Sequence, residues 1–444
     1  MDWLFWIWRS KAYQSIYALT VIGLAVFLFW FGSRREYWVS AWRQIRTNKL
    51  AMVCMIVLCL YIAAGLMDSI GWADAIRNDD GSLNRDDNGR IIYEATSLTL
   101  LDRICKPLIQ RTEKTYSAPL AVKSFSKEIV TTPDGNITRD YPRLEHAGTH
   151  LEDESDKGMD IFLRILGGFF IGLILGGIGS VILWLRNKSK IKDALFWGGV
   201  ILVLGFIIAS TVLLASAYHV LGTDKVGNDI LYRALKGIKT ALIIGGLTTA
   251  LAVPFAIFFG VIAGYFGGRM DDIVQYIYTT LASIPSILLI IAFMLLFGRG
   301  LFNLCLIMGI TSWTGLCRLL RGETLKLREL EYVQSARAFG VKSAKILIKH
   351  IVPNVMHIVL ISFLLRFSGL VLAEAMLSYL QIGVEPTRGS WGSMIDIARM
   401  ELAREPIVWW NLSAAFIFMV VLVLCANLFG DAVRDALDPR LRTE

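Results

Sequence analysis

Long apolar runs separated by shorter polar segments dominate the hydrophobic pattern of this chain. An α-helix needs about 20 predominantly apolar residues to cross a bilayer, and about nine runs approach that length. They cover residues 13–32, 50–67, 161–184, 194–216, 241–263, 275–297, 301–317, 355–376 and 408–428. The first run lacks a signal-peptide cleavage pattern and is long enough to stay in the membrane. The pattern therefore predicts an all-α, polytopic helical membrane protein with about nine transmembrane helices.

Composition and charge agree with a membrane protein and suggest its orientation. The chain is 55% hydrophobic and only 18% charged, which excludes a soluble domain of this length. Basic residues cluster in three connections, where they are Arg34, Arg35, Arg43, Arg46 and Lys49; Arg186, Lys188, Lys190 and Lys192; and Arg318, Arg321, Lys326, Arg328, Arg337, Lys342, Lys345 and Lys349. An alternating path puts all three clusters and the C-terminus in the cytoplasm, and the N-terminus outside, although Arg9 and Lys11 oppose this last placement. The net charge of +8 then faces lipid or a partner, and its scatter over separate loops argues against nucleic-acid binding.

The same path puts a long polar insert, residues 68–160, outside the membrane. Turn-rich pieces at 78–89 and 132–136 predict either a small domain or a partly ordered loop. Cys105 is the one cysteine of the insert, where we expect it to be exposed, and it has no partner there for a disulfide. The other cysteines lie in predicted spans and show no metal-binding spacing; they are Cys54, Cys59, Cys305, Cys317 and Cys425.

Candidate chemistry in the sequence is sparse. His146 and His150 are four residues apart, close to Glu152 and Asp153, and would share a face if they lay on a helix. A metal site would need more ligands in a defined geometry, so a solvated loop without metal is the favoured interpretation. The chain has no phosphate loop, no H-E-x-x-H and no G-x-S-x-G motif. It is therefore predicted not to be an enzyme, and uphill transport would need an ion gradient or another subunit.

The basic segment 318–354 lies between two apolar runs and is rich in helix formers. A charged helix is predicted from Arg318, continuing through Gln334 to Phe339, before Gly340 breaks or bends it. Val341 to Ile351 then begins a second helix, and Pro353 opens the next span. Two short helices joined at a glycine would make a rigid projection for docking a partner. An ordinary cytoplasmic loop whose charges only enforce topology is the alternative, and spacing alone leaves both open.

Four motifs, in order along the chain, resemble those of a known family. Q-S-A-R-A-F-G, nine residues and H-I-V-P-N (Gln334–Asn354) look like the E-A-A-x-x-x-G-x(9)-I-x-L-P loop of binding-protein-dependent ABC importer permeases. Leu221–Asp229 (LGTDKVGND), Glu374–Gly392 and Gly430–Arg442 resemble segments of the dipeptide/oligopeptide branch, in its C-type permease subunit. Together these motifs span about half of the chain and are specific as a set.

The resemblance implies a six-helix type I permease core in a bacterial inner membrane. The implied partners are a homologous second permease, two cytoplasmic ABC ATPases that hold ATP and Mg, an extracytoplasmic substrate-binding protein and a peptide substrate. This chain itself would bind no cofactor. The implied ATPase-docking element consists of Gln334, Ser335, Ala336, Arg337, Ala338, Gly340 and Pro353. An implied lid over the pore mouth consists of Gly222, Thr223, Asp224, Gly227 and Asp229, for which a capped turn is the structural alternative.

The chain also departs from the family pattern. Gln334 replaces a glutamate, Ser335 the first alanine and Asn228 an arginine, and Gln381 interrupts an L-G-L-G stretch. The predicted domains are an N-terminal extension at 1–193, with about three spans and the insert, and a permease core at 194–444 with a coupling loop at 318–354. In the alternative, Arg43–Val53 is the family's own entry into its first span, and the insert and two spans were added after it.

Further patterns predict helix packing and candidate pathway residues. Gly168, Gly172 and Gly176 recur on one helix face and predict close packing of two helices. Arg34–Lys49 places Trp38, Trp42 and Ile45 on one face and predicts an interfacial helix. Arg366 and Glu374 are ionisable residues within the eighth span, and they are candidates for the transport pathway.

Other classes of function stay open at this stage. Importers of nickel chelates or peptide-like antibiotics share these motifs. A secondary transporter usually carries ionisable residues deep in several spans, which are nearly absent here. In a membrane scaffold, the insert at 68–160 would be the working part.

Overall fold

A computed structural model describes residues 36–73, 75–76, 84–85, 98–131, 137–186, 191–385 and 388–437. Regular structure in these residues is mostly helical, with four short strands. Several predicted features lie outside the described residues, namely the first span at 13–32, the N-terminus with Arg9 and Lys11, Arg34, Arg35, the side chain of Trp38, most of the turn at 78–89, the turn at 132–136, Lys188, Lys190 and residues 438–442.

The chain divides into two compact units. The first contains Met1–Thr99, Lys236–Asp396 and Ile417–Glu444, and the second contains Leu100–Leu235 and Ile397–Phe416. Three of the four divisions fall within helices, namely α9 (Ile230–Phe266), α16 (Trp391–Glu401) and α17 (Trp410–Leu437), and the fourth falls between Thr99 and Leu100. The sequence-based division at residue 193 rests on family resemblance, and it stays a prediction.

The predicted membrane spans that fall within the described residues form helices. Seven helices are long and apolar enough to cross a membrane, or eight if one bent pair counts as a single span. The single helices or continuous helical segments are α4 (Lys49–Ser69), α7 (Lys157–Arg186), α8 (Ile191–Ala215), α9, α12 (Leu301–Leu327), Ser343–Tyr379 and α17. The predicted span at 275–297 is not one straight helix. It consists of α10 (Gly268–Ser283) and α11 (Ser286–Phe297), bent by 80° at Pro285, which lacks the N–H that would continue the helix.

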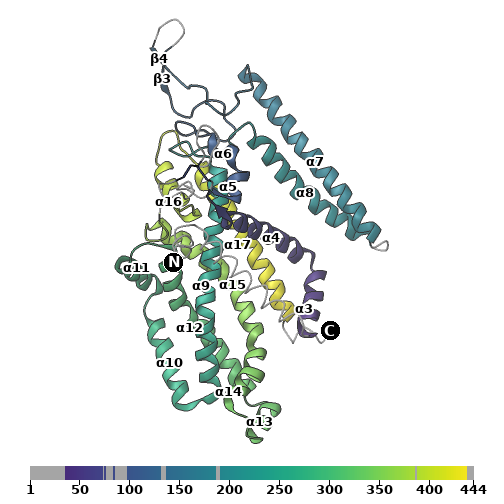
Figure 1. The fold of residues 1–444 in the computed structure, drawn as a ribbon, viewed down its shortest axis with the longest axis vertical. Helices are drawn as coiled ribbons and strands as arrows, with labels where there is room; N and C mark the ends of the chain where they lie inside the picture. Colours follow the sequence, from purple (N-terminus) through teal and green to yellow (C-terminus); the bar gives the residue numbers. More distant parts are fainter. Residues whose placement is uncertain are drawn as a thin grey trace. The chain divides into compact units, whose positions relative to one another are not determined.

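In the first unit, a buried cluster holds the helix ends that carry the coupling loop. Ala256, Cys317, Leu320, Ile346 and Ile351 form its fully buried centre. Figure 1 shows α10, α12, α14 (Ser343–Ile346) and α15 (Val352–Tyr379) converging near α13 (Glu331–Ala338).

The predicted interfacial helix forms as α3 (Glu36–Thr47), but protein covers part of its apolar face. Ala41 and Ile45 are buried in a cluster with Val433 and Leu437 near the end of α17. The first unit also contains the two-residue strands β1 (Gly71–Trp72) and β2 (Leu98–Thr99), which pair antiparallel.

The second unit contains the helix pair α7 and α8, which lie side by side in Figure 1. Gly168, Gly172 and Gly176 are buried in this interface, as the spacing predicted. A Cβ at Gly172 would lie 2.7 Å from the backbone nitrogen of Phe206, so only a bare backbone allows α7 and α8 to approach this closely.

The insert at 68–160 forms packed structure over its described part in the second unit. It contains α5 (Leu100–Ile104), α6 (Lys106–Gln110), the 3₁₀ turn Glu154–Asp156, and the antiparallel hairpin of β3 (Glu128–Thr131) and β4 (Ile137–Asp140). Its buried side chains include Leu101, Cys105, Leu108, Tyr116, Val122, Leu144 and Leu151. The expectation that Cys105 is exposed is therefore wrong, because this residue is only 7% exposed.

Candidate functional site

The coupling loop between α12 and α15 forms two helical pieces joined at a glycine, with two differences from the prediction. The predicted continuous helix from Arg318 to Phe339 is interrupted, because α12 ends at Leu327 and α13 begins at Glu331. The second piece is not a separate short helix. From Ser343 it passes through a π-helical turn, Leu347–Ile351, into α15. Pro353 accounts for the wider turn, because its ring cannot donate the hydrogen bond to residue 349 that an α-helix requires.

One face of α13 is fixed and the other is free. Val333 is buried and Ala336 packs against the surrounding core, whereas Gln334, Ser335, Arg337 and Ala338 are exposed. Beyond the helix, Phe339 is 87% exposed. Gly340 has a φ of +73°, and a Cβ added there would meet nothing within 4 Å. Within this chain, the backbone conformation therefore favours glycine at this position, and crowding by neighbours does not. The coupling loop is thus a supported element that presents an unfilled outer surface.

A hollow of about 480 Å³ lies beside α13. It is lined by Tyr265, Phe266, Arg328, Glu329, Gln334, Arg337 and Ala338. Gln334, which stands where the family motif has glutamate, donates through Nε2 to the carbonyl oxygen (3.1 Å) and to Oε2 (3.2 Å) of Glu329. Arg328 Nε donates to Oε1 of the same carboxylate at 2.8 Å. Glu329 therefore puts a carboxylate next to the position where the departure at 334 removed one.

The LGTDKVGND motif lies in the second unit, where it forms a buried, capped turn. Asp224 Oδ1 accepts from the backbone nitrogens of Val226 and Asn228, both at 2.9 Å. Asp229 Oδ1 accepts from the backbone nitrogen of Tyr232 at 3.2 Å, which caps the start of α9. Thr223, Asp224 and Asp229 are at most 2% exposed, so the structure shows the capped-turn alternative, and a role as a lid stays a prediction.

The arginine that the family motif has at position 228 has a substitute nearby. Asn228 donates through Nδ2 to Asp224 Oδ2 at 3.3 Å, and Arg233 forms an ion pair with the same oxygen. Arg233 is the fourth residue of α9, near the capped turn. A guanidinium thus still neutralises the buried Asp224.

Residues of the insert enclose the motif at Leu221–Asp229. The backbone nitrogen of Glu113 donates to the carbonyl oxygen of Gly227 at 3.1 Å, and the backbone nitrogen of Ser117 donates to Thr223 Oγ1 at 2.6 Å. Gly227 has a φ of +78°, and a Cβ there would lie 1.7 Å from the carbonyl oxygen of Glu113. The family motif and the insert are therefore built against each other at backbone contact.

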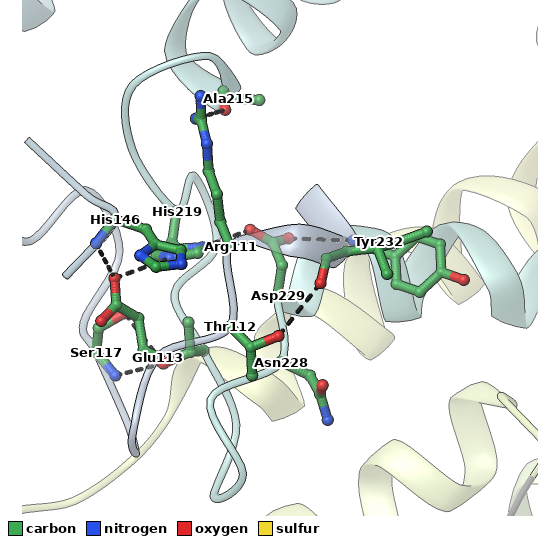
Figure 2. Close-up of polar contacts among 12 residues, drawn as sticks. Arg111, Thr112, Glu113, Ser117, His146, Ala215, His219, Asn228, Asp229 and Tyr232 are labelled. Atoms are coloured by element: carbon green, nitrogen blue, oxygen red, sulfur yellow. Dashed lines mark hydrogen bonds and ion pairs between the residues drawn. The ribbon is translucent and has the colours of Figure 1, made fainter. Parts of the chain in front are cut away.

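A buried charge cluster joins the same two segments (Figure 2). His219 Nδ1 lies 2.8 Å from Asp229 Oδ2, and His219 Nε2 lies 3.6 Å from Glu113 Oε1. The carboxylate of Glu113 also accepts from the backbone nitrogens of Glu145 and His146, each at 2.9 Å. All three ionisable side chains are at most 3% exposed.

The charges of this cluster support one another. Burial by itself would lower the pKa of His219, but Asp229 and Glu113 outweigh it and raise that pKa to about 9. Burial would raise the pKa of Glu113, but His219 and the two backbone N–H groups lower it to about 2. An imidazolium between two carboxylates is thus the stable form at neutral pH.

Several residues of this region lie outside the motifs that the sequence shows. His219 lies just before the recognised motif, and its neighbourhood was a usable signal. Glu113 is an isolated acidic residue in a polar insert and carries no signal of its own. Trp410, which donates through Nε1 to the carbonyl oxygen of Thr223 at 3.0 Å, reads in sequence as the start of a span. His146 and His150 do not share a helix face but lie in a turn-rich segment, and the described residues contain no cluster of three or more potential metal ligands.

The two pathway candidates lie apart on α15, in the first unit. Arg366 donates to the carbonyl oxygen of Ser312 on α12. Glu374 is 2% exposed and accepts a hydrogen bond from Ser378 Oγ at 2.7 Å. In the described part of the chain these two side chains form no ion pair with each other, as their separation of about 12 Å along a helix predicted.

The chain matches two known families. Residues 256–443 match the family described as the binding-protein-dependent transport system inner membrane component. Residues 36–75 match the N-terminal transmembrane domain of oligopeptide transport permease C. The second match covers α3 and α4, which favours α4 as the family's first span, with the insert, α7 and α8 placed after it.

Similar curated proteins are permease subunits of peptide transport systems. The oligopeptide transport system permease protein OppC of Bacillus subtilis is 37% identical over 224 residues, which is 50% of this chain and 72% of OppC. OppC of Haemophilus influenzae is 35% identical over 225 residues, 51% of this chain and 71% of the relative. The dipeptide transport system permease protein DppC of Bacillus subtilis is 33% identical over 227 residues, 51% and 70% of the two chains.

Proposed function

Because this chain belongs to the family of binding-protein-dependent transport system inner membrane components, we propose that it is the C-type permease subunit of an ATP-driven importer of dipeptides or oligopeptides. It is a multi-pass inner-membrane protein of a family of transport permeases. In the proposed complex it forms half of the pore with a homologous second permease. Two cytoplasmic ATPases, which hold ATP and Mg, would supply the energy, and an extracytoplasmic binding protein would deliver the peptide.

The observation that carries this proposal is the geometry of the coupling loop. α13 is held through Val333 and Ala336 against the core at the ends of α12 and α15. Its opposite face, with Phe339 beyond it, is exposed. A short helix supported by two spanning helices can transmit a displacement to both of them without stretching. The ATPase-docking surface is therefore proposed to be Gln334, Ser335, Arg337, Ala338 and Phe339, with Ala336 as part of the support.

The extracytoplasmic side of the importer is proposed to use the second unit. The buried turn at Leu221–Asp229 and the insert that encloses it would present a fixed surface to the binding protein. The buried imidazolium–carboxylate cluster keeps this surface rigid while the membrane helices move. The substrate class, peptides, is taken from the similarity to OppC and DppC.

The test is co-purification of the permease with its ATPases, combined with uptake into proteoliposomes. Ala338→Trp adds bulk to the exposed face of α13, and Gly340→Asp adds a charge where the chain has open space. Aspartate tolerates positive φ better than most residues, so the bend should survive. Ala336→Trp is less informative, because Ala336 packs against the core. Ile129→Trp, at a position 69% exposed on β3, is the matched control.

We expect the two loop variants to insert normally, to lose the ATPases on purification and to lose ATP-dependent peptide uptake. The control should insert normally and keep the ATPases, because Ile129 is not part of α13 or the residues that follow it. If both loop variants retain the ATPases and support uptake, this loop is not the coupling site. Uptake driven by an ion gradient without any ATPase would instead indicate a secondary transporter.

A further inference from the structure

A cavity of about 360 Å³ opens among three membrane helices of the first unit. Its lining comes from α9, α12 and α15, and includes Thr249, Trp313, Leu316, Phe363, Arg366 and Leu370. Arg366 is the one charged residue among the described residues that line it. The volume falls within the range of small-ligand sites, which are mostly apolar and carry a few placed polar groups.

Neighbouring residues of α12 hold the guanidinium of Arg366 in a defined position in this cavity. It donates through Nη1 to the carbonyl oxygen of Ser312. A Cβ at residue 315 would lie 2.6 Å from Nη2, so Gly315 leaves the space that the guanidinium occupies. The side chain is therefore held against the backbone of α12.

Within the described residues, this cation has no carboxylate partner. Its one polar contact there is the carbonyl of Ser312, whereas a guanidinium carries five N–H donors. Glu374, the other ionisable side chain of α15, is about 12 Å farther along the helix axis and is hydrogen-bonded to Ser378.

The position of the charge makes the missing partner significant. Arg366 lies at the middle of the 28-residue helix α15, which runs from Val352 to Tyr379. Charges at the centre of a membrane span are expensive, and they usually face a cavity and mark a substrate pathway. A planar guanidinium fixed at one nitrogen still offers a paired set of donors that matches a carboxylate.

We propose that Arg366 binds a carboxylate of the transported peptide in this cavity as the peptide passes through the membrane. The inference rests on the proposed import of peptides and deepens it. The carboxylate comes from the C-terminus of the peptide or from an acidic side chain. Trp313, Leu316, Phe363 and Leu370 provide an apolar wall for the side chains of the peptide.

The experiment uses the complete transporter in proteoliposomes, with binding protein pre-saturated by each peptide, so that delivery does not limit the comparison. The peptides are a neutral tripeptide with a free C-terminus, its C-terminal amide, and an amidated tripeptide with one glutamate. The variants are Arg366→Gln, Arg366→Lys and Gly315→Ala. The last variant keeps the charge but places a methyl group in the space that the guanidinium occupies. Arg269→Gln, at an exposed arginine of α10, is the control.

We expect Arg366→Gln to reduce uptake of carboxylate-bearing peptides about 10-fold or more and to remove the preference over the neutral amide. Arg366→Lys should retain part of that preference, Gly315→Ala should weaken it, and Arg269→Gln should leave it unchanged. If the wild type prefers only the free C-terminus, that carboxylate is the ligand. If the amidated glutamate peptide is also preferred, side-chain carboxylates bind as well.

Two results would overturn the inference while leaving the proposed function intact. The first is a wild-type transporter that imports peptides, with Arg366→Gln showing the same preference. The second is loss of the partner permease from purified Arg366→Gln, because Arg366 would then pair with a carboxylate of that subunit. Absence of any ATP-dependent peptide uptake by the wild type would instead contradict the proposed function.

Discussion

Phe339 is predicted to be the main apolar anchor of the ATPase on the coupling loop. It follows α13 directly and is 87% exposed, more than Ile348, another exposed apolar residue of the loop at 72%. A large aromatic side chain in water next to a supported helix is typical of the residues that dominate protein interfaces. The perturbation is Phe339→Ala.

The expected magnitude follows from the surface that docking would remove from water. A phenylalanine buries about 150–250 Å², and at about 25 cal/mol per Å² its present exposure corresponds to about 3–5 kcal/mol on full burial. The methyl group kept by alanine and the side-chain freedom lost on docking reduce the difference to about 2–3 kcal/mol. The Kd for the ATPase should therefore rise about 30- to 150-fold.

The assay is a titration of purified ATPase onto the permease complex reconstituted in nanodiscs. Thermal unfolding of the permease should not change, because the side chain of Phe339 is almost entirely exposed in this chain. Ile129→Ala removes a comparably exposed apolar side chain from β3, in the insert predicted to lie outside the membrane. That control should leave the Kd unchanged.

Two outcomes would refute the reasoning. A Kd within about twofold of the wild type would show that Phe339 stays in water in the complex. A lowered unfolding temperature together with weaker binding would show that Phe339 supports the loop instead of contacting the ATPase.

Three further predictions concern orientation, pH and packing. In a cysteine-free background, a cysteine at Lys114, whose side chain is 71% exposed, should react with an impermeant thiol reagent from outside. A cysteine at the exposed Lys342 should react only from the cytoplasm, and reversed labelling would overturn the orientation. The pKa of His219 is raised to about 9, so its contribution to the free energy of unfolding is complete below about pH 6.5 and is lost as pH rises through 9. The pKa of Glu113 is lowered to about 2, so its contribution is complete above about pH 4.5 and is lost as pH falls toward 2. The unfolding temperature in detergent should thus fall between pH 6.5 and 9 for the wild type and stay flatter for His219→Gln, and equal slopes would contradict the cluster. Gly172→Leu should destabilise the α7–α8 pair by about 1–3 kcal/mol, because the new side chain would overlap the facing backbone, and an unchanged melting temperature would argue against this interface.

Local patterns predicted the membrane helices well. The apolar runs from 50–67 onward each coincide with a helix or with the bent pair. Hydropathy succeeds here because a bilayer requires a continuous apolar helix, and both its length and its composition are visible in a short window. The spacing of Gly168, Gly172 and Gly176 succeeded for a similar reason, since a four-residue repeat places small residues on one helix face.

Local patterns were less accurate where the backbone changes direction. The coupling loop was predicted in its place, but the break at Arg328–Leu330 and the π-helical turn before α15 were not. Both depend on how α13 and α14 fold back onto the core around Ile346 and Ile351, since helix formers populate the sequence on either side of each break. The bend at Pro285 carried a signal, but a hydropathy window averages over it.

The sequence by itself determined the class of molecule, the spans that fall within the described residues, the helical connection at 318–354 and, through ordered motifs, the family. Only the tertiary structure decided that the insert at 68–160 is packed, that Cys105 is buried, and that Glu113 and Asp229 enclose His219. The physical reason is range along the chain. A span or a cap depends on residues within one or a few helical turns, whereas Ser117 and Thr223 meet across 106 residues, and no periodicity of either segment encodes that pairing.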